Sequence, residues 1–387
     1  MNKKLVINLS IILLIVAVLS FFAFSSPKKA EEKFVQFDLT GMNASTNGFD
    51  KALSKRIFKF PKDFGKHEEF QTEWWYYTGN LFDSVGRHFG YQLTFFRRGI
   101  DSKNNVFRES GWATNQIYFA HFTITDTENE THLQKEKMAR SALNLAGAKS
   151  EELFEVWLYD WRVEQKSENE FQVTASTDDF SINLTLIDEK GPILQGDYGL
   201  SKKGDQSGNA SYYFSQTRLS TNGTITIGKD VHSVLGFSWM DHEFGSSTLG
   251  ENQIGWDWFS LQFDNNEEMM LFQIRQEDNS ISKNSSGILV KNDSTTRSIG
   301  SEEFSLRVLD QWETYDGYVY PIKWSIFIES EDLELTIEPV IKQQENELFF
   351  RYWEGAVRVT GFKNGQAISG YGYVEMTGYA QSMKGVF

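Results

Sequence analysis

The chain has 387 residues, a formal net charge of -15 and no cysteine. Without cysteine there is no disulfide framework, no thiol chemistry and no lipid attached to a cysteine, so stability must come from a hydrophobic core. The acidic balance, with no basic stripe to offset it, excludes nucleic acid as a partner. The mature length is sufficient for two domains of ordinary size.

Residues 1–25 have the composition of a targeting segment. Lys3 and Lys4 precede an apolar run from Leu5 to Phe24, and Ala23-Phe24-Ser25 matches a small-x-small cleavage site. The run, about 20 residues long, also has the length of a membrane span. The sequence therefore predicts an exported protein, periplasmic or secreted, whose N-terminal segment is either a cleaved signal peptide or an uncleaved membrane anchor. Residues 26–60 are polar and irregular and are predicted to be a linker or an arm on the first domain.

The segment that begins at Glu73 is the most informative in the chain, because four consecutive aromatic residues follow it. Side chains alternate along a strand, so Glu73, Trp75 and Tyr77 are predicted to share one face, with Trp74 and Tyr76 on the other. Large rings on both faces do not fit a half-solvated strand. They fit a barrel wall, with one aromatic set filling the interior and the other packing outward.

From Gln71 onward, short alternating runs are bounded by turn residues, which predicts strands and a mainly β fold class. Only five prolines interrupt the chain, as uninterrupted strands require. Asn222-Gly223 is predicted to be the turn of a hairpin. Thr131 to Ser150 is the one segment predicted to be helical, from the spacing of its leucines and its methionine.

Aromatic residues make up 15% of the chain, with 32 Phe, 15 Tyr and 11 Trp. This exceeds the need of a core of this size and favours a cavity or groove for a flat or long apolar ligand. The alternative is a β-rich protein that uses aromatic residues simply as strand residues. Composition leaves both interpretations open.

A weak internal repeat runs along the chain. The matching pieces follow in the same order in both halves, at an offset of about 180 residues. The order indicates duplicated β-barrels, and we predict a first domain over residues 61–240 and a second over residues 241–387. The matches are Trp75–Asp83 with Trp256–Asp264, Arg97 with Arg275, and Asp63-Phe64-Gly65 with Glu243-Phe244-Gly245.

The segment from Gly236 to Gly245 is the densest group of side chains suited to chemistry. On a strand, Trp239, Asp241 and Glu243 share one face and His242 points to the other. Two carboxylates beside a tryptophan can form a split pair, in which the more buried acid stays protonated while the other is ionised. The alternative is a strand that ends in a solvated acidic turn.

Three arginines, Arg97, Arg218 and Arg275, each end an aromatic strand. Each is predicted to form a structural ion pair, with Glu73 and Asp241 as candidate partners, or to stack on rings. The six histidines are dispersed and show no metal-ligand spacing, so we predict no metal site and no cofactor. The sequence also contains no serine-nucleophile elbow and no phosphate-binding glycine loop.

A series of motifs along nearly the whole mature chain resembles one known family. It is the family of secreted lipocalin-like proteins that includes AttH-like proteins and carotenoid 1,2-hydratases (hydroxyneurosporene synthases). The resemblance implies two lipocalin-like antiparallel β-barrel domains packed together. The matching segments are Gln71–Gly79, Tyr91–Arg97, Ala120-His121-Phe122, Tyr213–Arg218, Trp239–Gly245, Gly255–Trp258, Tyr352–Gly355 and Gly370–Tyr379.

The resemblance also implies a chemistry. Adding water to an alkene needs a strong acid that protonates carbon and aromatic faces that stabilise the resulting cation. By its match to the motif, Asp241 is the candidate acid, and His242 or Glu243 would orient the acid or the water. Trp239 and Tyr213 are the candidate stabilisers of the cation. The export signal favours the AttH-like branch, whose substrate is unassigned, over the true hydratases.

We therefore expect an exported protein that binds an apolar ligand, a lipid or an isoprenoid. It acts on this ligand as a hydratase or hydrolase, with Asp241, His242 and Glu243 as its catalytic residues. The alternatives are a non-catalytic lipid carrier and a sugar-binding protein with exposed tryptophans. Membrane attachment would run through the N-terminal segment. The predicted substrate-binding residues are Trp239, Tyr213, Trp75, Tyr77, Trp256 and Trp258.

Overall fold

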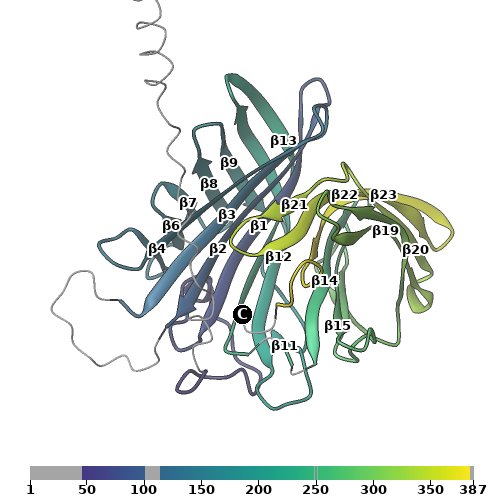
Figure 1. Ribbon diagram of the computed structural model, residues 1–387, viewed down its shortest axis with the longest axis horizontal. Coiled ribbons are helices and arrows are strands. Elements are labelled where there is room, and N and C mark those ends of the chain that lie inside the picture. Colours follow the sequence, from purple (N-terminus) through teal and green to yellow (C-terminus); the bar gives the residue numbers. More distant parts are fainter. Residues whose placement is uncertain (1–45, 101–113, 248, 251, 384–387) are drawn as a thin grey trace, which may run out of the picture. The chain divides into compact units, whose positions relative to one another are not determined.

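The computed structural model describes residues 46–100, 114–247, 249–250 and 252–383, which all belong to one compact unit over residues 42–387. The predicted targeting segment and the first part of the predicted arm lie outside the described residues. The described chain is almost entirely antiparallel β, as predicted, and forms two curled sheets (Figure 1). Within this part of the chain, no helix has the length and hydropathy needed to cross a membrane.

The first sheet has 13 strands in the order β4-β3-β2-β1-β13-β12-β9-β8-β7-β6-β5, with β10 and β11 paired to β12. A 3-10 helix, η2 (Lys62–Phe64), precedes it. Its strands are β1 (Thr72–Asp83), β2 (His88–Gly99), β3 (Gln116–Asp126), β4 (Thr131–Arg140), β5 (Ala146–Lys149), β6 (Glu155–Leu158), β7 (Trp161–Gln165), β8 (Glu170–Ser176), β9 (Phe180–Asp188), β10 (Ile193–Leu194), β11 (Leu200–Lys202), β12 (Ala210–Ile227) and β13 (Asp230–Gly245).

The second sheet has 10 strands in the order β17-β16-β15-β14-β23-β22-β20-β19-β18, with β21 paired to β22. It includes one 3-10 turn, η3 (Glu329–Glu331). Its strands are β14 (Gln253–Phe263), β15 (Glu268–Gln276), β16 (Ser286–Val290), β17 (Thr296–Gly300), β18 (Ser305–Glu313), β19 (Val319–Ile328), β20 (Leu333–Pro339), β21 (Glu345–Glu347), β22 (Arg351–Lys363) and β23 (Gln366–Met376).

The connections show that each sheet curls into a near-closed barrel. Strands β4 and β5 lie at opposite ends of the first sheet, yet only residues 141–145 join them. Strands β17 and β18 lie at opposite ends of the second sheet and are joined by residues 301–304. A chain covers about 3.5 Å per residue, so each connection spans roughly 20 Å at most. The two edges of each sheet must therefore lie close together, which gives the predicted pair of barrels.

The two barrels repeat the same topology. In the first, β1 pairs with β2 and with the last strand, β13, and in the second, β14 pairs with β15 and with the last strand, β23. The residue-level matches of the sequence are nevertheless out of register. Trp75 points into the first barrel, whereas Trp256 packs on the outside of the second. Asp63-Phe64-Gly65 contains part of η2, whereas Glu243-Phe244-Gly245 belongs to β13, so this match is coincidental.

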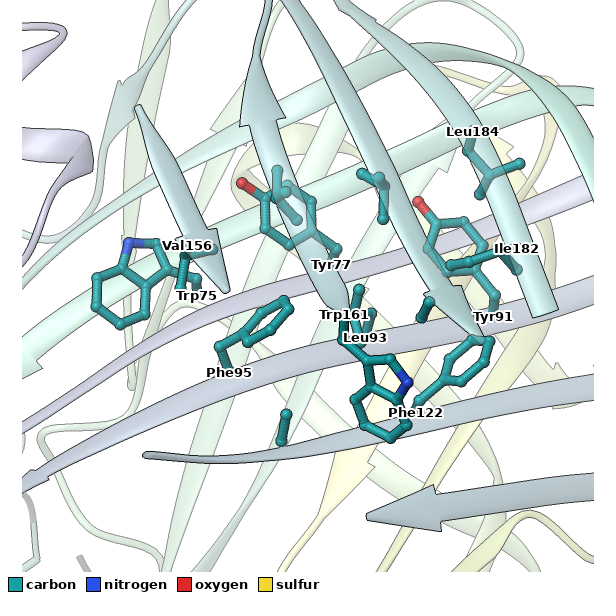
Figure 2. Packing of buried hydrophobic residues seen from close by; sticks show 14 of the residues in the cluster. Trp75, Tyr77, Tyr91, Leu93, Phe95, Phe122, Val156, Trp161, Ile182 and Leu184 are labelled. Atoms are coloured by element: carbon teal, nitrogen blue, oxygen red, sulfur yellow. The ribbon is translucent and has the colours of Figure 1, made fainter. Parts of the chain in front are cut away.

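Aromatic and aliphatic side chains fill the interior of the first barrel. Figure 2 shows Trp75 and Tyr77 of β1 packed with Phe95 of β2 and Trp161 of β7. All four are fully buried. Trp75 and Tyr77 lie on the inward face of β1. This is the face that the alternation of the sequence predicted for Glu73, Trp75 and Tyr77. The interior of this barrel is therefore a packed core.

The segment predicted to be helical forms strands instead. Residues 131–140 are β4, which pairs along its whole length with β3, and residues 146–149 are β5. Leu133 and Met138 are an odd number of positions apart, so they lie on opposite faces of a strand. Leu133 packs on the core of the first barrel, and Met138 packs on an aromatic cluster outside it. Each face of β4 thus has its own tertiary partner, and these contacts override the local helical spacing.

The predicted hairpin turn at Asn222-Gly223 is also wrong, because β12 runs straight through it. Here β12 is a central strand, paired with β9 on one side and β13 on the other. A Cβ at Gly223 would lie 2.1 Å from the Asn183 carbonyl oxygen of β9. The glycine therefore permits a close approach between strands, and pairing on both sides overrides the turn propensity of the dipeptide.

The predicted domain boundary between residues 240 and 241 falls inside β13. The first sheet continues to Gly245 and the second begins at Gln253. The described part of the predicted arm lies on the first barrel, where Phe58 and Phe60 both pack against Phe214.

The three arginines form ion pairs, as predicted, although only one uses a predicted partner. Arg97 pairs with Glu73 at 2.7 Å, while Arg218 pairs with Glu268 at 2.5 Å and Arg275 with Asp257 at 3.2 Å. Both members of the Arg97–Glu73 pair are fully buried. The guanidinium also donates to Gln116 and to two backbone carbonyl oxygens.

We predict that Arg97→Met lowers the free energy of unfolding by about 3–5 kcal/mol, because it leaves the Glu73 carboxylate buried without its charge partner. Denaturant unfolding followed by tryptophan fluorescence measures the loss. The control is Arg162→Met, since Arg162 forms a more exposed ion pair with Glu155 and should lose less than about 1 kcal/mol. Equal losses in the two variants would contradict the role of the buried pair.

Candidate active site

The candidate site lies where the outer faces of the two barrels pack against each other. Trp74 and Tyr76 point outward from β1, and β13 sets Glu243 and Asp241 directly beside them in register. On the other side, Trp258 of β14 packs edge-on against Tyr76, with ring centroids 5.1 Å apart. Strands at this junction are therefore buried on both faces, one against their own barrel and one against the other barrel.

A cavity with a volume of about 70 Å³ opens in this junction. Its volume holds several water molecules or the end of a larger ligand. Half of its lining residues are aromatic, and three carboxyl groups and one lysine are among the others. The lining residues are Trp74, Tyr76, Thr94, Phe96, Lys203, Tyr213, Asp241, Glu243, Leu249, Trp256, Trp258, Phe272, Ile274 and Glu375.

Asp241 is held in the cavity wall by three neutral donors. The Tyr213 hydroxyl donates to Oδ2 at 2.5 Å, Trp239 Nε1 donates to Oδ1 at 2.7 Å, and the Ser215 hydroxyl also donates to Oδ1. The Tyr213 oxygen in turn accepts a hydrogen bond from Trp258 Nε1 at 3.1 Å. The carboxyl is thus fixed in place by groups from both barrels.

The environment of Asp241 favours its protonated form. Burial raises the pKa of Asp241 to about 7, although the hydrogen bonds from Ser215, Tyr213 and Trp239 act in the opposite direction. Among the described residues, no arginine, lysine or histidine forms an ion pair with it. Near neutral pH a substantial fraction of the molecules therefore carries a carboxylic acid in the cavity wall.

The second predicted carboxylate, Glu243, has a different setting. Its Oε1 lies 3.0 Å from Lys203 Nζ and also accepts a hydrogen bond from the Ser211 hydroxyl. The Lys203 ammonium packs over the rings of Tyr213 and Phe272. Glu243 is therefore paired with a cation, whereas Asp241 is not, so the two carboxyls of this strand have different partners.

The third carboxyl of the cavity, Glu375, comes from the second barrel. Trp256 Nε1 donates to its Oε2 at 2.7 Å. Burial raises the pKa of Glu375 to about 7, against the effect of this hydrogen bond, and the charges of Glu243 and Asp241 add to the shift. The sequence assigned no role to Glu375. The only signal was its position in the matching segment Gly370–Tyr379.

His242 does not lie in the cavity, since it points into the first barrel. There its Nε2 lies 2.9 Å from Glu73 Oε1, and its ring packs against Trp75 and Phe214. Burial lowers the pKa of His242 to about 4. The alternation of side chains along β13 places Asp241 and Glu243 on one face and His242 on the other, so the predicted catalytic trio is divided between two environments.

His242 belongs to a buried cluster that the dispersed histidines of the sequence did not reveal. The ligand-type atoms of His67, Glu73 and His242 all lie within 4.8 Å of one another. They are hydrogen-bonded together: His67 Nδ1 lies 2.8 Å from Glu73 and its Nε2 lies 3.0 Å from Asp63. Burial opposes the charge of His67, but these carboxylates raise its pKa. With Arg97 also on Glu73, the cluster is already balanced by its own charges.

The predicted substrate-binding residues divide in the same way. Tyr213, Trp256 and Trp258 line the cavity. Trp239 contacts Asp241 and packs against Trp258, with ring centroids 6.3 Å apart. Trp75 and Tyr77 instead belong to the core of the first barrel, because they lie on the inward face of β1. Lys203, which lies in none of the sequence motifs, was not predicted.

Comparison with known proteins gives the chain its relatives. A solved structure of an AttH from Nitrosomonas europaea shares 30% sequence identity and has a TM-score of 0.75, covering 86% of this chain and 100% of that one. Kievitone hydratase from Nectria haematococca has 14% identity and a TM-score of 0.64, covering 86% and 96%. CghA, solved with Sch210972, has 11% identity and a TM-score of 0.52, covering 88% and 98%. The last two similarities concern the fold alone.

No curated protein matches this chain in sequence. The model of one protein family, described as AttH-like, matches residues 51–379, which include both barrels and the cavity between them. On this match and the relative from Nitrosomonas europaea, the chain belongs to the AttH-like family.

Proposed function

We propose that the cavity between the barrels binds the end of an apolar ligand, a lipid or an isoprenoid, and that Asp241 acts on it as a general acid in a hydratase reaction. One observation carries the proposal: a buried carboxylic acid without a cationic partner among the described residues lies in an aromatic cavity. A cavity carboxyl of this kind, with its pKa near the working pH, is suited to proton transfer.

The reaction has a balanced course. The acid proton of Asp241 goes to one carbon of a branched alkene, which leaves a tertiary cation and the Asp241 carboxylate. The rings of Tyr213 and Trp258, which lie next to the acid, stabilise the cation. Water then adds to the cationic carbon and loses a proton, and a proton returns to Asp241. The sum is the addition of one water molecule to a carbon–carbon double bond.

The fold neighbours support this choice of reaction class. Kievitone hydratase is a hydratase by its name, and CghA has been solved with the small molecule Sch210972. Both have the same fold at low sequence identity. They therefore support a reaction on a small molecule, and they do not identify a substrate. Export is also part of the proposal, and the charged and apolar pattern of residues 1–25 supports it.

The alternative is a non-catalytic carrier of an apolar ligand. Its support is the large share of aromatic rings in the cavity wall and the pairing of Glu243 with Lys203. A carrier has no use for an acid held by three donors, which is why we favour the hydratase. A sugar-binding role has less support, because Trp74 and Trp256 line the cavity between the barrels and are only partly exposed.

Asp241→Asn is expected to make the protein less sensitive to pH. The folded state holds a proton on Asp241 up to about pH 7, whereas the unfolded chain loses it near a pKa of about 3.9. The stabilisation that protonated Asp241 gives the folded state is therefore fully present below the pKa of the unfolded chain. It is lost as the pH rises through the pKa of Asp241 in the folded state. The melting temperature is measured at pH 5 and at pH 8. Its decrease from pH 5 to pH 8 should be smaller in the variant than in the wild type. An identical fall would mean that Asp241 is ionised in the folded protein.

The same substitution tests catalysis. With a branched isoprenoid alkene and ¹⁸O-labelled water, the wild type should form a labelled tertiary alcohol. Asp241→Asn should lower the rate by about 100-fold or more, because it removes the proton donor and keeps the shape of the side chain. Product formation is followed by mass spectrometry.

The control for this experiment is Asp188→Asn. Asp188 is a buried aspartate with a raised pKa that lies outside the cavity lining, so its loss should leave the rate unchanged. Ligand binding without any labelled product in the wild type would favour the carrier. Equal rates in the wild type and in Asp241→Asn would remove Asp241 from the mechanism.

A further inference from the structure

The two oxygens of the Asp241 carboxyl group have different surroundings. Oδ1 accepts hydrogen bonds from Trp239 Nε1 at 2.7 Å and from the Ser215 hydroxyl. Both of these donors are buried, and neither belongs to the cavity lining. Oδ2 lies 2.5 Å from the Tyr213 hydroxyl oxygen, and Tyr213 does line the cavity. Of the three groups bonded to this carboxyl, only Tyr213 therefore reaches a ligand.

The position of the proton in the acid form follows from these contacts. An indole N–H can only donate, so Trp239 donates to Oδ1. The Ser215 oxygen accepts a hydrogen bond from Gln195 Nε2 at 2.8 Å, and its own hydrogen points to Oδ1. Oδ1 thus accepts two hydrogen bonds, as the carbonyl oxygen of a carboxylic acid does. The acid proton of Asp241 then lies on Oδ2, next to the Tyr213 oxygen.

The Tyr213 hydroxyl consequently has two orientations. When Asp241 is ionised, the hydroxyl donates to Oδ2. When Asp241 is protonated, the phenol oxygen accepts from Oδ2 and also accepts from Trp258 Nε1, which lies 3.1 Å away. The hydroxyl hydrogen is then released from Asp241 and can be donated into the cavity that Tyr213 lines. Protonation of Asp241 thus gives the cavity a phenol hydrogen.

Tyr213 cannot act as the acid by itself. Burial and the charges of Asp241 and Glu243 hold the pKa of Tyr213 well above its usual range, so a phenolate is unfavourable here. A phenol that gains one proton while it loses another stays neutral throughout. After such a transfer its new hydrogen points to Oδ2 of the ionised Asp241, and this is the hydrogen bond that the structure contains.

We propose that Tyr213 gives its hydroxyl proton to the ligand and that Asp241 replaces this proton in the same step. The electron pair of the double bond forms the new C–H bond with the hydrogen of Tyr213. The Oδ2 hydrogen of Asp241 moves to the Tyr213 oxygen. The products are a carbocation, a neutral Tyr213 and the Asp241 carboxylate, so atoms and charges balance. This inference rests on the proposed function and adds Tyr213 to it as a second catalytic residue.

Tyr213→Phe tests the relay, because it removes the hydroxyl and keeps the ring beside the cation. The rate at which the branched isoprenoid alkene gives ¹⁸O-labelled product is measured from pH 5 to pH 9. The relay predicts that the variant loses about 100-fold or more in rate at every pH. Binding of the alkene, followed by the fluorescence of the cavity tryptophans, should stay unchanged, and this binding also shows that the variant is folded.

A purely structural role of the hydroxyl gives a different pH profile. Burial raises the pKa of Asp241 and the hydrogen bond from Tyr213 lowers it, so losing this bond raises the pKa further. The maximal rate would then persist, and its decline toward alkaline pH would move to higher pH. The other titratable groups in the cavity wall are the paired Glu243 and Lys203 and also Glu375, and all are common to both proteins. A shifted profile with an undiminished maximum overturns the relay.

The two orientations of the hydroxyl also give a signal that needs no turnover. The intensity ratio of the tyrosine Raman doublet depends on whether the phenol donates or accepts hydrogen bonds. The difference between the ultraviolet resonance Raman spectra of the wild type and Tyr213→Phe isolates the doublet of Tyr213. It should change from an accepting phenol at pH 5 to a donating one at pH 9, and Asp241→Asn should abolish the change. A doublet that stays constant with pH overturns the inference.

Tyr91→Phe is the matched control. Tyr91 is a buried tyrosine whose hydroxyl donates to Ser238 at 2.7 Å in the core of the first barrel, so its loss should leave the rate unchanged. An unchanged rate in Tyr213→Phe and a reduced one in Asp241→Asn overturn the relay and keep Asp241 as the direct donor. Absence of labelled product in the wild type refutes the proposed reaction and the relay with it. A doublet that still changes with pH would then support only the hydrogen-bond switch between Asp241 and Tyr213.

Discussion

The packing of two barrel walls against each other is the constraint on which the rest of this structure depends. A strand at an ordinary barrel wall faces a core on one side and water on the other, whereas nine of the twelve residues of β1 are buried. Polar groups at the junction therefore need partners from the opposite barrel. Arg218 and Lys190 both pair with Glu268, and Asn80 donates to the Gly372 carbonyl oxygen. These contacts join the two barrels.

Strands β1 and β13 hold carboxyl groups whose pKa values are shifted in opposite directions on the two faces. Inside the first barrel, burial opposes the ionised form of Glu73, but Arg97 and two histidines hold its pKa well below the usual range. On the outer face, Asp241 has only neutral donors, and burial raises its pKa. The charge partner, more than burial, decides the difference. One face is thus suited to structural ion pairing and the other to proton transfer.

Duplication of a barrel places the candidate site between the copies. The interior of the first barrel is filled by side chains such as Trp75 and Trp161 (Figure 2), so it does not serve as the ligand site that the barrel shape would imply. Each copy instead supplies acids to the junction, Asp241 from β13 and Glu375 from β23. Neither barrel alone contains the complete lining, and the sequence named Asp241 and Tyr213 from the first barrel and Trp256 and Trp258 from the second without showing that they meet.

The sequence by itself determined the β class and the sorting of side chains along each strand, because alternation is a local property of an extended chain. The pair of barrels followed from the internal repeat and from the family resemblance. It correctly separated Trp75 and Tyr77 from Trp74 and Tyr76, and His242 from Asp241. Only the tertiary structure decided which face of β1 and β13 belongs to the core and which to the cavity. Alternation divides the side chains between two faces, but it does not say which face points into the barrel. Tertiary pairing also turned Thr131–Arg140 into a strand and carried β12 straight through Asn222-Gly223, and it brought Glu375 to the cavity.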